Sequence, residues 1–297
     1  MTIQRNHLNL ARDIPYIMGI INLTPESFHK PALGINSVLK QAEHMVDAGA
    51  EILDIGAIAT NPSININQLI NPNEELALVM EAVTAIRAHL GHDIFLSIDS
   101  FNTSTILEVL KTNIDMINIQ QGTISIDIAD QLAASGVYTC IMHWPDPAFL
   151  NNGANPDQSK NADSHSVYYQ QRVAAIITDL TSISAKLIAA GMRSNKLVID
   201  PGFGGGHYGK SDDENLYMLY HLPQFLAVKH PILVGLSRKG FLSRLLSEGD
   251  DSLQISVSSA LIAAQNGAKI LRVHDVKETA DAIKVIHTLS KFRTNEL

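Results

Sequence analysis

The sequence predicts a (β/α)8 barrel that forms a single domain over residues 1–297, with its core at about residues 14–290. Two observations predict it. Eight short apolar runs alternate with amphipathic helical segments, and a polar side chain follows nearly every run at the same end. No linker or shift in composition divides the chain. An open doubly wound sheet is the alternative, because the same alternation builds it.

The eight apolar runs are the expected strands, and they are rich in Ile, Val and Leu. They cover residues 14–21, 51–55, 94–98, 116–119, 137–142, 196–199, 231–236 and 269–273. The runs are continuous rather than alternating between apolar and polar residues. This pattern is typical of parallel strands that are covered on both faces.

Helical segments follow the strands in turn. They cover residues 36–50, 71–91, 103–112, 125–136, 166–191, 212–228, 252–267 and 275–292. Asn71 and two carboxylates favour a helix start, and Gly49 and Gly91 suit helix ends. The polar stretch 144–165 is expected to be a loop over one face of the barrel.

Composition narrows the class of function. Apolar residues make up 45% of the chain, which is enough for a sizeable core, and the net charge is −8. An acidic protein is not expected to bind nucleic acid, because phosphate backbones need a basic face. Cys140 is the single cysteine, so an internal disulfide is excluded and a reducing compartment is indicated. No signal peptide and no apolar run near the ~20 residues of a membrane span are found, so a cytoplasmic protein without membrane contact is expected.

Polar residues at the ends of the predicted strands form the candidate site. They are Asn22, Thr60, Asn61, Pro62, Asp99, Asn118, His143, Asp200, Ser237, Lys239, Arg272 and His274. In a barrel of this class the carboxyl ends of the strands surround the active site. Charges that face one another across this mouth are costly unless they are paired or hold a ligand. The set therefore predicts a ligand site.

The residue types also indicate the chemistry of the ligand. Carboxylates and amides can bind a flat heterocycle that is rich in N–H donors. Lys239, Arg272 and His274 can hold an anion such as pyrophosphate. Asn22 offers an oxygen that suits Mg²⁺, the usual companion of pyrophosphate.

Eight segments resemble, in order, the motifs of the dihydropteroate synthase family of pterin-binding barrels. They are IMGIINLTPESF, EILDIGAIATNP, LSIDSF, DMINI, IMH, LVIDPGFG, LVGLSRKGF and ILRVHDV, and they extend from Ile17 to Val276. The Asn-x-Thr-Pro-x-Ser-Phe opening and the Arg-Val-His-Asp-Val ending are the most specific. The resemblance implies a (β/α)8 barrel that joins 6-hydroxymethyl-7,8-dihydropterin pyrophosphate to 4-aminobenzoate in folate biosynthesis. It also implies a homodimer, for which the last two helices are the candidate surface.

The resemblance implies a role for each matching residue. The pterin would be held by Asp99, Asn118, Asp200 and Lys239, with Met142 packing on its ring. Pyrophosphate would be held by Asn22, Arg272 and His274, with Asn22 also on Mg²⁺. The aminobenzoate pocket would be bordered by Ser237 and Thr60, with Pro62 nearby.

The implied mechanism ionises the bond between the pterin methylene and pyrophosphate. Asp99 would stabilise the resulting cation, while Mg²⁺, Arg272 and His274 neutralise the leaving group. The weak aromatic amine then attacks, so no activated nucleophile of the protein is needed. Residues 24–28 are expected to belong to a loop that covers the reacting centre.

The second motif departs from the family pattern. Ile58, Ala59 and Asn61 stand where the family has Glu, Ser and Arg, and Ile119 stands where it often has Asp. A similar loop without the Arg occurs in sulfonamide-insensitive synthases, which gives altered sulfonamide sensitivity as a hypothesis. Two other functions stay open: a methyltetrahydrofolate methyltransferase-like enzyme, and a catalytically silent or altered-acceptor pterin-binding paralogue.

The glycine segment after Asp200 is longer than the family pattern. Tyr208 and Lys210 are expected as the counterparts of the family's aromatic residue and lysine in this segment. Trp144 has two interpretations, as a border of the pterin site or as a cap on the long loop.

Overall fold

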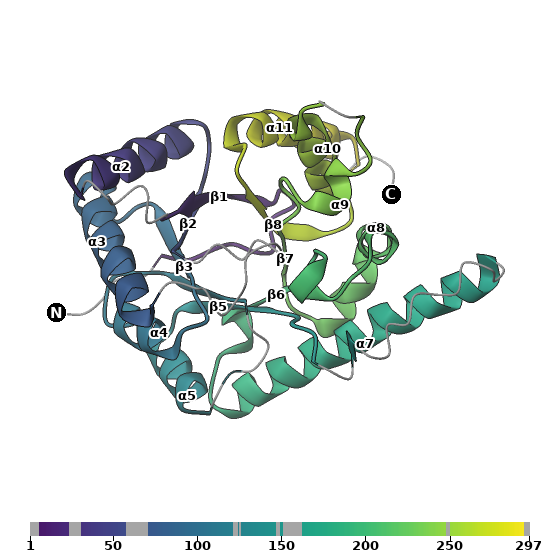
Figure 1. Cartoon of the computed structure of the whole chain (residues 1–297), viewed down its shortest axis with the longest axis horizontal. Coiled ribbons are helices and arrows are strands. Elements are labelled where there is room, and N and C mark those ends of the chain that lie inside the picture. The colour runs from purple at the N-terminus through teal and green to yellow at the C-terminus, as the bar shows by residue number, and fades with distance from the viewer. Residues whose placement is uncertain are drawn as a thin grey trace.

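The fold is a closed barrel of eight parallel strands surrounded by helices (Figure 1). The computed structural model describes residues 6–23, 31–57, 71–120, 124, 126–146, 149–150, 162–247 and 250–293. The strands follow one another in chain order, and β8 pairs with β1 to close the ring. The predicted (β/α)8 barrel is therefore confirmed, and the open doubly wound sheet is excluded.

Each predicted apolar run forms one strand. The strands are β1 (Tyr16–Asn22), β2 (Ile52–Gly56), β3 (Phe95–Asp99), β4 (Met116–Ile119), β5 (Tyr138–Met142), β6 (Leu197–Asp200), β7 (Ile232–Val234) and β8 (Ala268–Val273). The ends differ from the prediction by one or two residues. β1 begins after Pro15, because proline has no N–H to donate to a neighbouring strand.

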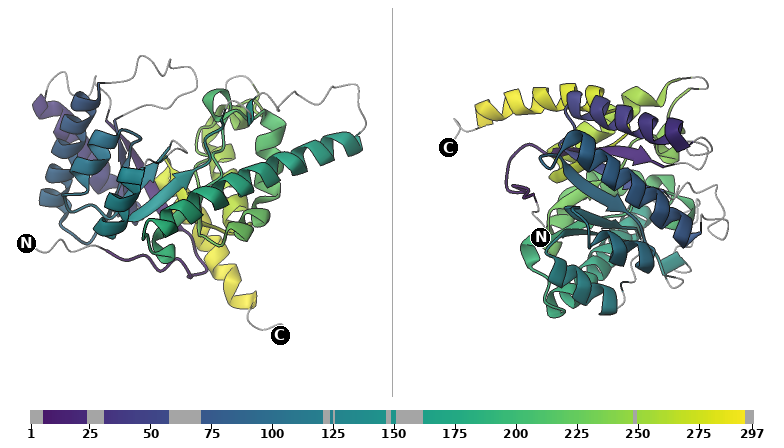
Figure 2. Two further views of the ribbon diagram at one scale, coloured as in Figure 1. Left: turned by 90° about the horizontal axis from the view of Figure 1, so that it is seen from below. Right: turned by 90° about the vertical axis from the view of Figure 1, so that its left-hand side faces the viewer.

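Helices cover the outside of the barrel. They are α2 (Pro31–Asp47), α3 (Pro72–Leu90), α4 (Thr103–Val109), α5 (Ile126–Ser135), α7 (Ala162–Ala189), α8 (Asp212–Tyr220), α9 (Gly240–Ser243), α10 (Ser252–Gln265) and α11 (Val276–Arg293). Short 3-10 turns are η2 (Ser194–Lys196), η3 (Gly206–Tyr208) and η4 (Leu222–Val228). The helix predicted over residues 212–228 is thus two elements, because Pro223 cannot continue the α-helical hydrogen bonding of α8. The first turns of α7 and the last turns of α11 extend beyond the body of the barrel (Figure 2).

Local sequence sets the helix ends near the site. Ser211 caps α8 by accepting from the backbone N–H of Glu214 at 3.2 Å, and the Glu214 side chain accepts from the Ser211 N–H at 2.6 Å. The side chain of Asn71 accepts from Asn73 N–H at the start of α3, and Gly91 ends that helix at a φ of 76°. The start of α3 at Asn71 and its end at Gly91 were predicted from the sequence, whereas the Ser211 cap was not.

The barrel interior changes from apolar to polar along the strands. The apolar interior cluster holds Tyr16, Met18, Ile52, Phe95, Met116, Tyr138, Cys140, Val198, Leu233 and Ile270. Successive inward positions on a strand are two residues apart. The inward positions that follow therefore include Asp54, Asn118, Met142, Asp200 and Arg272. Polarity thus gathers at the carboxyl end.

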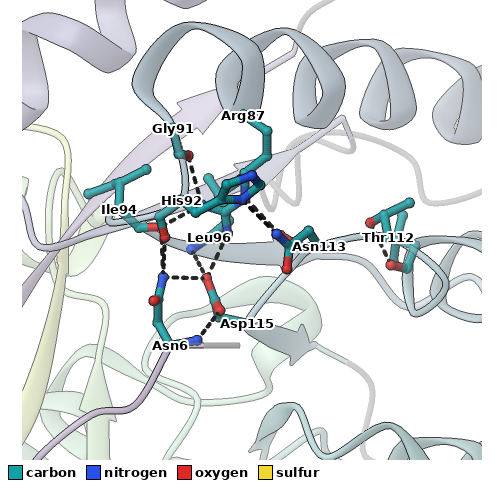
Figure 3. A network of polar contacts seen from close by, with 10 residues as sticks. Asn6, Arg87, Gly91, His92, Ile94, Leu96, Thr112, Asn113 and Asp115 are labelled. Carbon is teal, nitrogen blue, oxygen red and sulfur yellow. Dashed lines mark hydrogen bonds and ion pairs between the residues drawn. The ribbon is translucent and has the colours of Figure 1, made fainter. Parts of the chain in front are cut away.

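The segment before β1 covers the amino-terminal end of the barrel. Leu8 and Leu10 pack against the interior cluster. Asn6 N–H donates to Asp115 Oδ1 at 2.7 Å, and Arg87 Nη2 lies 2.7 Å from Asp115 Oδ2 (Figure 3). Leu96 N–H also donates to Asp115, at 2.9 Å. This end is held by a buried polar network.

Among the described helices, none combines the length and the apolar character needed to cross a membrane.

Candidate active site

The structure brings most of the predicted site residues to the carboxyl end of the barrel. Asp99, Met142 and Asp200 end their strands, and Asn118 and Arg272 point inward one step earlier. Ser237, Lys239 and His274 follow β7 and β8, and Asn22 ends β1 with an exposed side chain. Thr60 and Pro62, the divergent residues 58–61 and the loop 24–28 lie outside the described residues, so their roles stay predictions.

A buried ion cluster occupies the centre of this mouth. Arg272 Nε lies 2.6 Å from Asp54 Oδ2, and Arg272 Nη2 lies 2.5 Å from Asp99 Oδ2. Asp54 is fully buried and Asp99 nearly so. One guanidinium therefore bridges carboxylates from β2 and β3. Because two acids share one base, the cluster retains excess negative charge beneath the mouth.

Two amide side chains complete the cluster. Gln120 Nε2 donates to Asp99 Oδ2, and Asn118 Nδ2 donates to Asp54 Oδ2 at 3.3 Å. The buried oxygens Asp54 Oδ1 and Gln120 Oε1 have no hydrogen-bond partner among the described residues. Buried acceptors are nearly always satisfied in folded proteins. The cluster can therefore accept hydrogen bonds from a ligand with N–H groups.

Burial sets the ionisation of Asp99. Desolvation raises the pKa of Asp99 to about 7, although the Arg272 charge lowers it, and the Asp54 charge raises it further. Burial alone would lower the pKa of Arg272, but Asp54 and Asp99 raise it above its usual value. Arg272 is therefore charged at neutral pH, while Asp99 changes its charge near neutrality.

A cavity opens above the cluster. It is lined by Asn118, Gln120, Met142, Asp200, Phe203, Tyr208, Gly235, Lys239 and Arg272. Five of the residues that the sequence assigned to the pterin or to pyrophosphate thus share one cavity, namely Asn118, Met142, Asp200, Lys239 and Arg272. Acceptors, an ammonium and a thioether surround the same space, which suits a flat, polar heterocycle.

The glycine segment after β6 shapes one wall of the cavity. Asp200 Oδ1 accepts from Gly202 N–H at 2.7 Å. Burial raises the pKa of Asp200, and this hydrogen bond and the Lys239 charge oppose the shift. Gly202 has a φ of +72°, and a Cβ there would lie 2.4 Å from the carbonyl oxygen of His143. Only glycine fits this position.

Aromatic side chains face Lys239 on the same side. The Lys239 ammonium lies 4.4 Å from the centroid of the Tyr208 ring, which is a cation–π distance. The Trp144 and Tyr208 ring centroids are 5.7 Å apart, so Trp144 borders the cavity wall through Tyr208. Lys210 lies behind this wall, where its ammonium is 3.2 Å from His143 Nδ1.

The loops after β7 and β8 are tied together beside Arg272. His274 N–H donates to Ser237 Oγ at 3.2 Å, and His274 Nδ1 lies 3.1 Å from the same oxygen. Arg238 pairs with Asp275 at 2.6 Å and has a φ of 58°, which is rare for a residue other than glycine. Burial lowers the pKa of His274 to about 4, helped by the charges of Arg238 and Arg272. His274 is thus neutral at pH 7 and can donate one N–H.

Asn22 is the one predicted metal ligand. The part of the chain that the structure describes contains no group of three or more His, Cys, Asp and Glu side chains that could hold a metal ion. A dedicated metal cage is therefore not found there. Mg²⁺ keeps several waters and takes phosphate oxygens, so it needs only one or two protein oxygens. The exposed amide of Asn22 fits that role beside a bound pyrophosphate.

Two residues of the cluster were missed by the sequence analysis. Asp54 contacts Arg272 and Gln120 contacts Asp99, although neither Asp54 nor Gln120 was among the predicted site residues. For Asp54 a signal exists, because a lone carboxylate interrupts the apolar run 51–55. Gln120 also carried a signal, because it directly follows the apolar run 116–119.

Comparison with protein families gives one match that covers most of the chain. The model for pterin binding enzymes matches residues 18–274. The matched span begins within β1 and ends just after β8, so it includes every strand of the barrel except the first residues of β1.

Curated and solved relatives agree with this match. Dihydropteroate synthase of Haemophilus influenzae is 33% identical over 289 residues, covering 96% of this chain and 98% of the relative. The solved Coxiella burnetii dihydropteroate synthase in complex with pteroic acid has a TM-score of 0.78 and 34% identity, and the match covers 93% of both chains. The Anaplasma phagocytophilum dihydropteroate synthase with bound 6-hydroxymethylpterin-monophosphate has a TM-score of 0.80 and 29% identity, over 93% of this chain and 99% of that one.

Proposed function

The chain belongs to the family of pterin binding enzymes, among the dihydropteroate synthases, and we propose how its barrel mouth carries out their reaction. This transferase reaction joins 6-hydroxymethyl-7,8-dihydropterin pyrophosphate to 4-aminobenzoate and yields 7,8-dihydropteroate and pyrophosphate. The observation that carries the proposal is the buried Asp54–Arg272–Asp99 cluster beneath a cavity lined by two amides and the Asp200 carboxylate. A methyltransferase is not supported, because its methyl donor has no leaving pyrophosphate for the cationic side of the mouth to bind.

The pterin occupies the cavity above the cluster in this proposal. Asp200, Asn118 and the free oxygen of Gln120 accept from the ring N–H and amino groups. Lys239 donates to ring acceptors, and Met142 packs on a face of the ring. Asp200 must be ionised to accept from two donors, and the neighbouring Lys239 charge favours that state.

Asp99 stabilises the transition state. Loss of pyrophosphate leaves a positive methylene carbon conjugated to the electron-rich pterin. A carboxylate held in a buried site stabilises such a charge strongly, because little water screens it. Arg272 and Gln120 fix Asp99 Oδ2 in place before the reaction, so no reorganisation is needed.

The leaving group departs toward Asn22, Arg272 and His274. Arg272 supplies the fixed positive charge, and neutral His274 supplies an N–H donor beside Ser237. When bound, Mg²⁺ supplies charge neutralisation on pyrophosphate, with Asn22 as its protein ligand. In this proposal Ser237 borders the 4-aminobenzoate pocket, and the roles of Thr60 and Pro62 there stay predictions from the sequence. The amine attacks the cation and releases one proton.

The direct test is a turnover assay with purified protein, dihydropterin pyrophosphate, Mg²⁺ and 4-aminobenzoate. We expect dihydropteroate and pyrophosphate to form in equal amounts. Binding of the pterin without dihydropteroate would identify a silent or altered-acceptor paralogue instead. A parallel titration with a sulfonamide tests the altered second loop, for which we expect weaker inhibition than in a synthase with the family's Arg.

We also propose that the chain forms a homodimer in the cytoplasm. Large apolar side chains stay exposed on α10 and α11: Ile262 at 44%, Val285 at 58% and Leu289 at 53%. Such surface side chains on neighbouring helices suit a two-fold contact. Light scattering of the wild-type chain and of Val285→Asp tests the dimer. A monomeric mass for the wild type would contradict it.

A further inference from the structure

The loop between β6 and α8 is hydrogen-bonded to the surrounding elements at several points. Gly202 N–H donates to Asp200 Oδ1, and Gly204 N–H donates to Asn215 Oδ1, each at 2.7 Å. Arg172 Nη2 donates to the carbonyl of Gly209 at 3.0 Å. The loop is held to its strand, to α8 and to α7. A loop with so many ties can present a side chain to the cavity in a fixed position.

Lys210 makes one further tie from inside the protein. Its side chain is buried, and its ammonium donates to the carbonyl of Tyr208 at 3.0 Å. The same ammonium lies 3.2 Å from His143 Nδ1, which can accept from it when the imidazole proton is on Nε2. His143 Nε2 in turn faces Asp179 Oδ2 of α7 at 3.5 Å. His143 Nε2 has no hydrogen-bond partner among the described residues, so the chain of hydrogen bonds runs from His143 through Lys210 to the Tyr208 backbone.

Tyr208 carries this tie to the cavity. Lys210 is not among the residues that line the cavity, whereas Tyr208 is. The Tyr208 ring packs against Gly204, where a Cβ would lie 2.9 Å from Tyr208 Cδ2, and it faces the Lys239 ammonium. Direct contacts from Lys210 therefore reach a ligand through Tyr208, while its charge also acts on Asp200.

We propose that Lys210 is a positioning residue: it fixes the Tyr208 ring as one wall of the pterin cavity. His143 in turn supports Lys210. The inference rests on the proposed function, because it takes the cavity ligand to be a pterin. It gives a role to the buried side chains of Lys210 and His143, which the proposed mechanism does not use.

The energetics of burial support this assignment. Burial lowers the pKa of Lys210 to about 7, and the charges of Asp200 and Glu214 oppose the shift. Burial also lowers the pKa of His143 to about 4, with a contribution from the Lys210 charge. Neutral His143 can therefore accept from Lys210. A buried ammonium is costly, and this one is satisfied by acceptors that all belong to the cavity wall or its support.

The test measures binding of 6-hydroxymethylpterin monophosphate by calorimetry to the full-length wild type, Lys210→Met, Tyr208→Ala and the double variant. Lys196→Met is the matched control. Lys196 is also buried, lies 3.7 Å over the Tyr138 ring and contacts His7, but it precedes β6 at the opposite end of the barrel. Thermal unfolding of each variant checks folding, and the KM for 4-aminobenzoate is measured in parallel.

We expect Lys210→Met to weaken binding of the pterin probe about tenfold, the loss of roughly one hydrogen bond to a charged group. The KM of Lys210→Met for 4-aminobenzoate should stay near the wild-type value. The affinity of the control Lys196→Met for the pterin probe should also stay near the wild-type value. In the Tyr208→Ala background Lys210→Met should add little, because residues that act through one another are not additive. Should Lys210→Met fail to fold, His143→Phe replaces it, and the same loss of probe affinity is expected.

Two results would overturn the proposal. One is wild-type affinity in Lys210→Met, and the other is a full additional loss on top of Tyr208→Ala. A wild type that does not bind the probe at all would contradict the proposed function itself. That outcome is distinct, because it appears before any variant is compared.

Discussion

At the scale of single residues, Arg272 is the centre of the site. It is the group between Asp54 and Asp99, and it also lines the cavity. The two acids cannot both be buried and ionised without it, because each would then face an unpaired like charge. Arg272 therefore holds the mouth of the barrel together, and in the proposed reaction it also supplies positive charge where the leaving group departs.

Removal of Arg272 should destabilise the whole protein. We expect Arg272→Met to lower the free energy of unfolding by ~3–5 kcal/mol, since it leaves two buried carboxylates without their partner. Arg244→Met is the matched control, because Arg244 pairs with Asp212 at 2.5 Å on the surface and should contribute less than ~1 kcal/mol. Denaturant titration measures both values, and equal losses would contradict the role of the buried cluster.

The activity should depend on pH through Asp99. The pKa of Asp99 is raised to about 7, so the carboxyl group is protonated and neutral below that pH and ionised above it. If the ionised form stabilises the cation, kcat should rise by about tenfold between pH 6 and pH 8. Initial rates at saturating substrate measure this. Equal rates at the two pH values would show that the charge of Asp99 is not required.

At the scale of elements, the loop after β6 is the most constrained part of the site. It supplies Phe203 and Tyr208 to the cavity, beside Asp200 at the end of β6, and its backbone passes within contact distance of His143. Its glycines therefore differ in what they tolerate. Gly202 has a left-handed φ and no room for a side chain, whereas Gly205 has a φ of −92° and room for a Cβ at ordinary van der Waals distance.

Paired alanine substitutions test this difference. Gly202→Ala places a Cβ 2.4 Å from the His143 carbonyl oxygen. We therefore expect the free energy of unfolding to fall by ~1–3 kcal/mol or more, and pterin binding to weaken. Gly205→Ala meets its nearest atom at 3.5 Å and should change stability by less than ~0.5 kcal/mol. Thermal unfolding and titration with a pterin compare the two. A tolerated Gly202→Ala would contradict the close packing of the loop.

The elements were predictable to different degrees. The eight strands follow from apolar runs, and the start of α3 follows from the capping side chain of Asn71. The split of the helix over 212–228 at Pro223 could have been expected from the proline alone. Contacts such as Lys210 with His143 could not, because they join residues 67 positions apart that no local pattern relates.

At the scale of the whole molecule, the two ends of the barrel have different roles. The carboxyl end gathers the cavity and its charges, while the amino end is closed by residues 6–10 and the Asp115 network (Figure 3). This division is general for (β/α)8 barrels, in which catalysis and stability occupy opposite faces. The sequence predicted the functional end from the polar strand ends, but Asp54 was not predicted, because it lies within an apolar run and points inward two residues after Ile52.

Asp115→Asn should therefore affect stability and leave catalysis intact. It removes the charge that pairs with buried Arg87, so we expect the free energy of unfolding to fall by ~3–5 kcal/mol. The kcat should stay unchanged at a temperature where the variant is folded. Glu51→Gln is the control, because its pair with Arg12 is half exposed and should contribute less than ~1 kcal/mol. A fall in kcat for folded Asp115→Asn would show that the two ends are coupled.

The central claim is that the buried carboxylate of Asp99 stabilises the pterin cation. The measurement that tests it most directly compares kcat with pterin affinity in Asp99→Asn, which keeps the shape of the side chain and removes its charge. We predict a fall in kcat of about 100-fold or more, with a dissociation constant for 6-hydroxymethylpterin monophosphate that changes only a few-fold. A near-normal kcat, or a fall in kcat matched by an equal loss of pterin affinity, would contradict the claim.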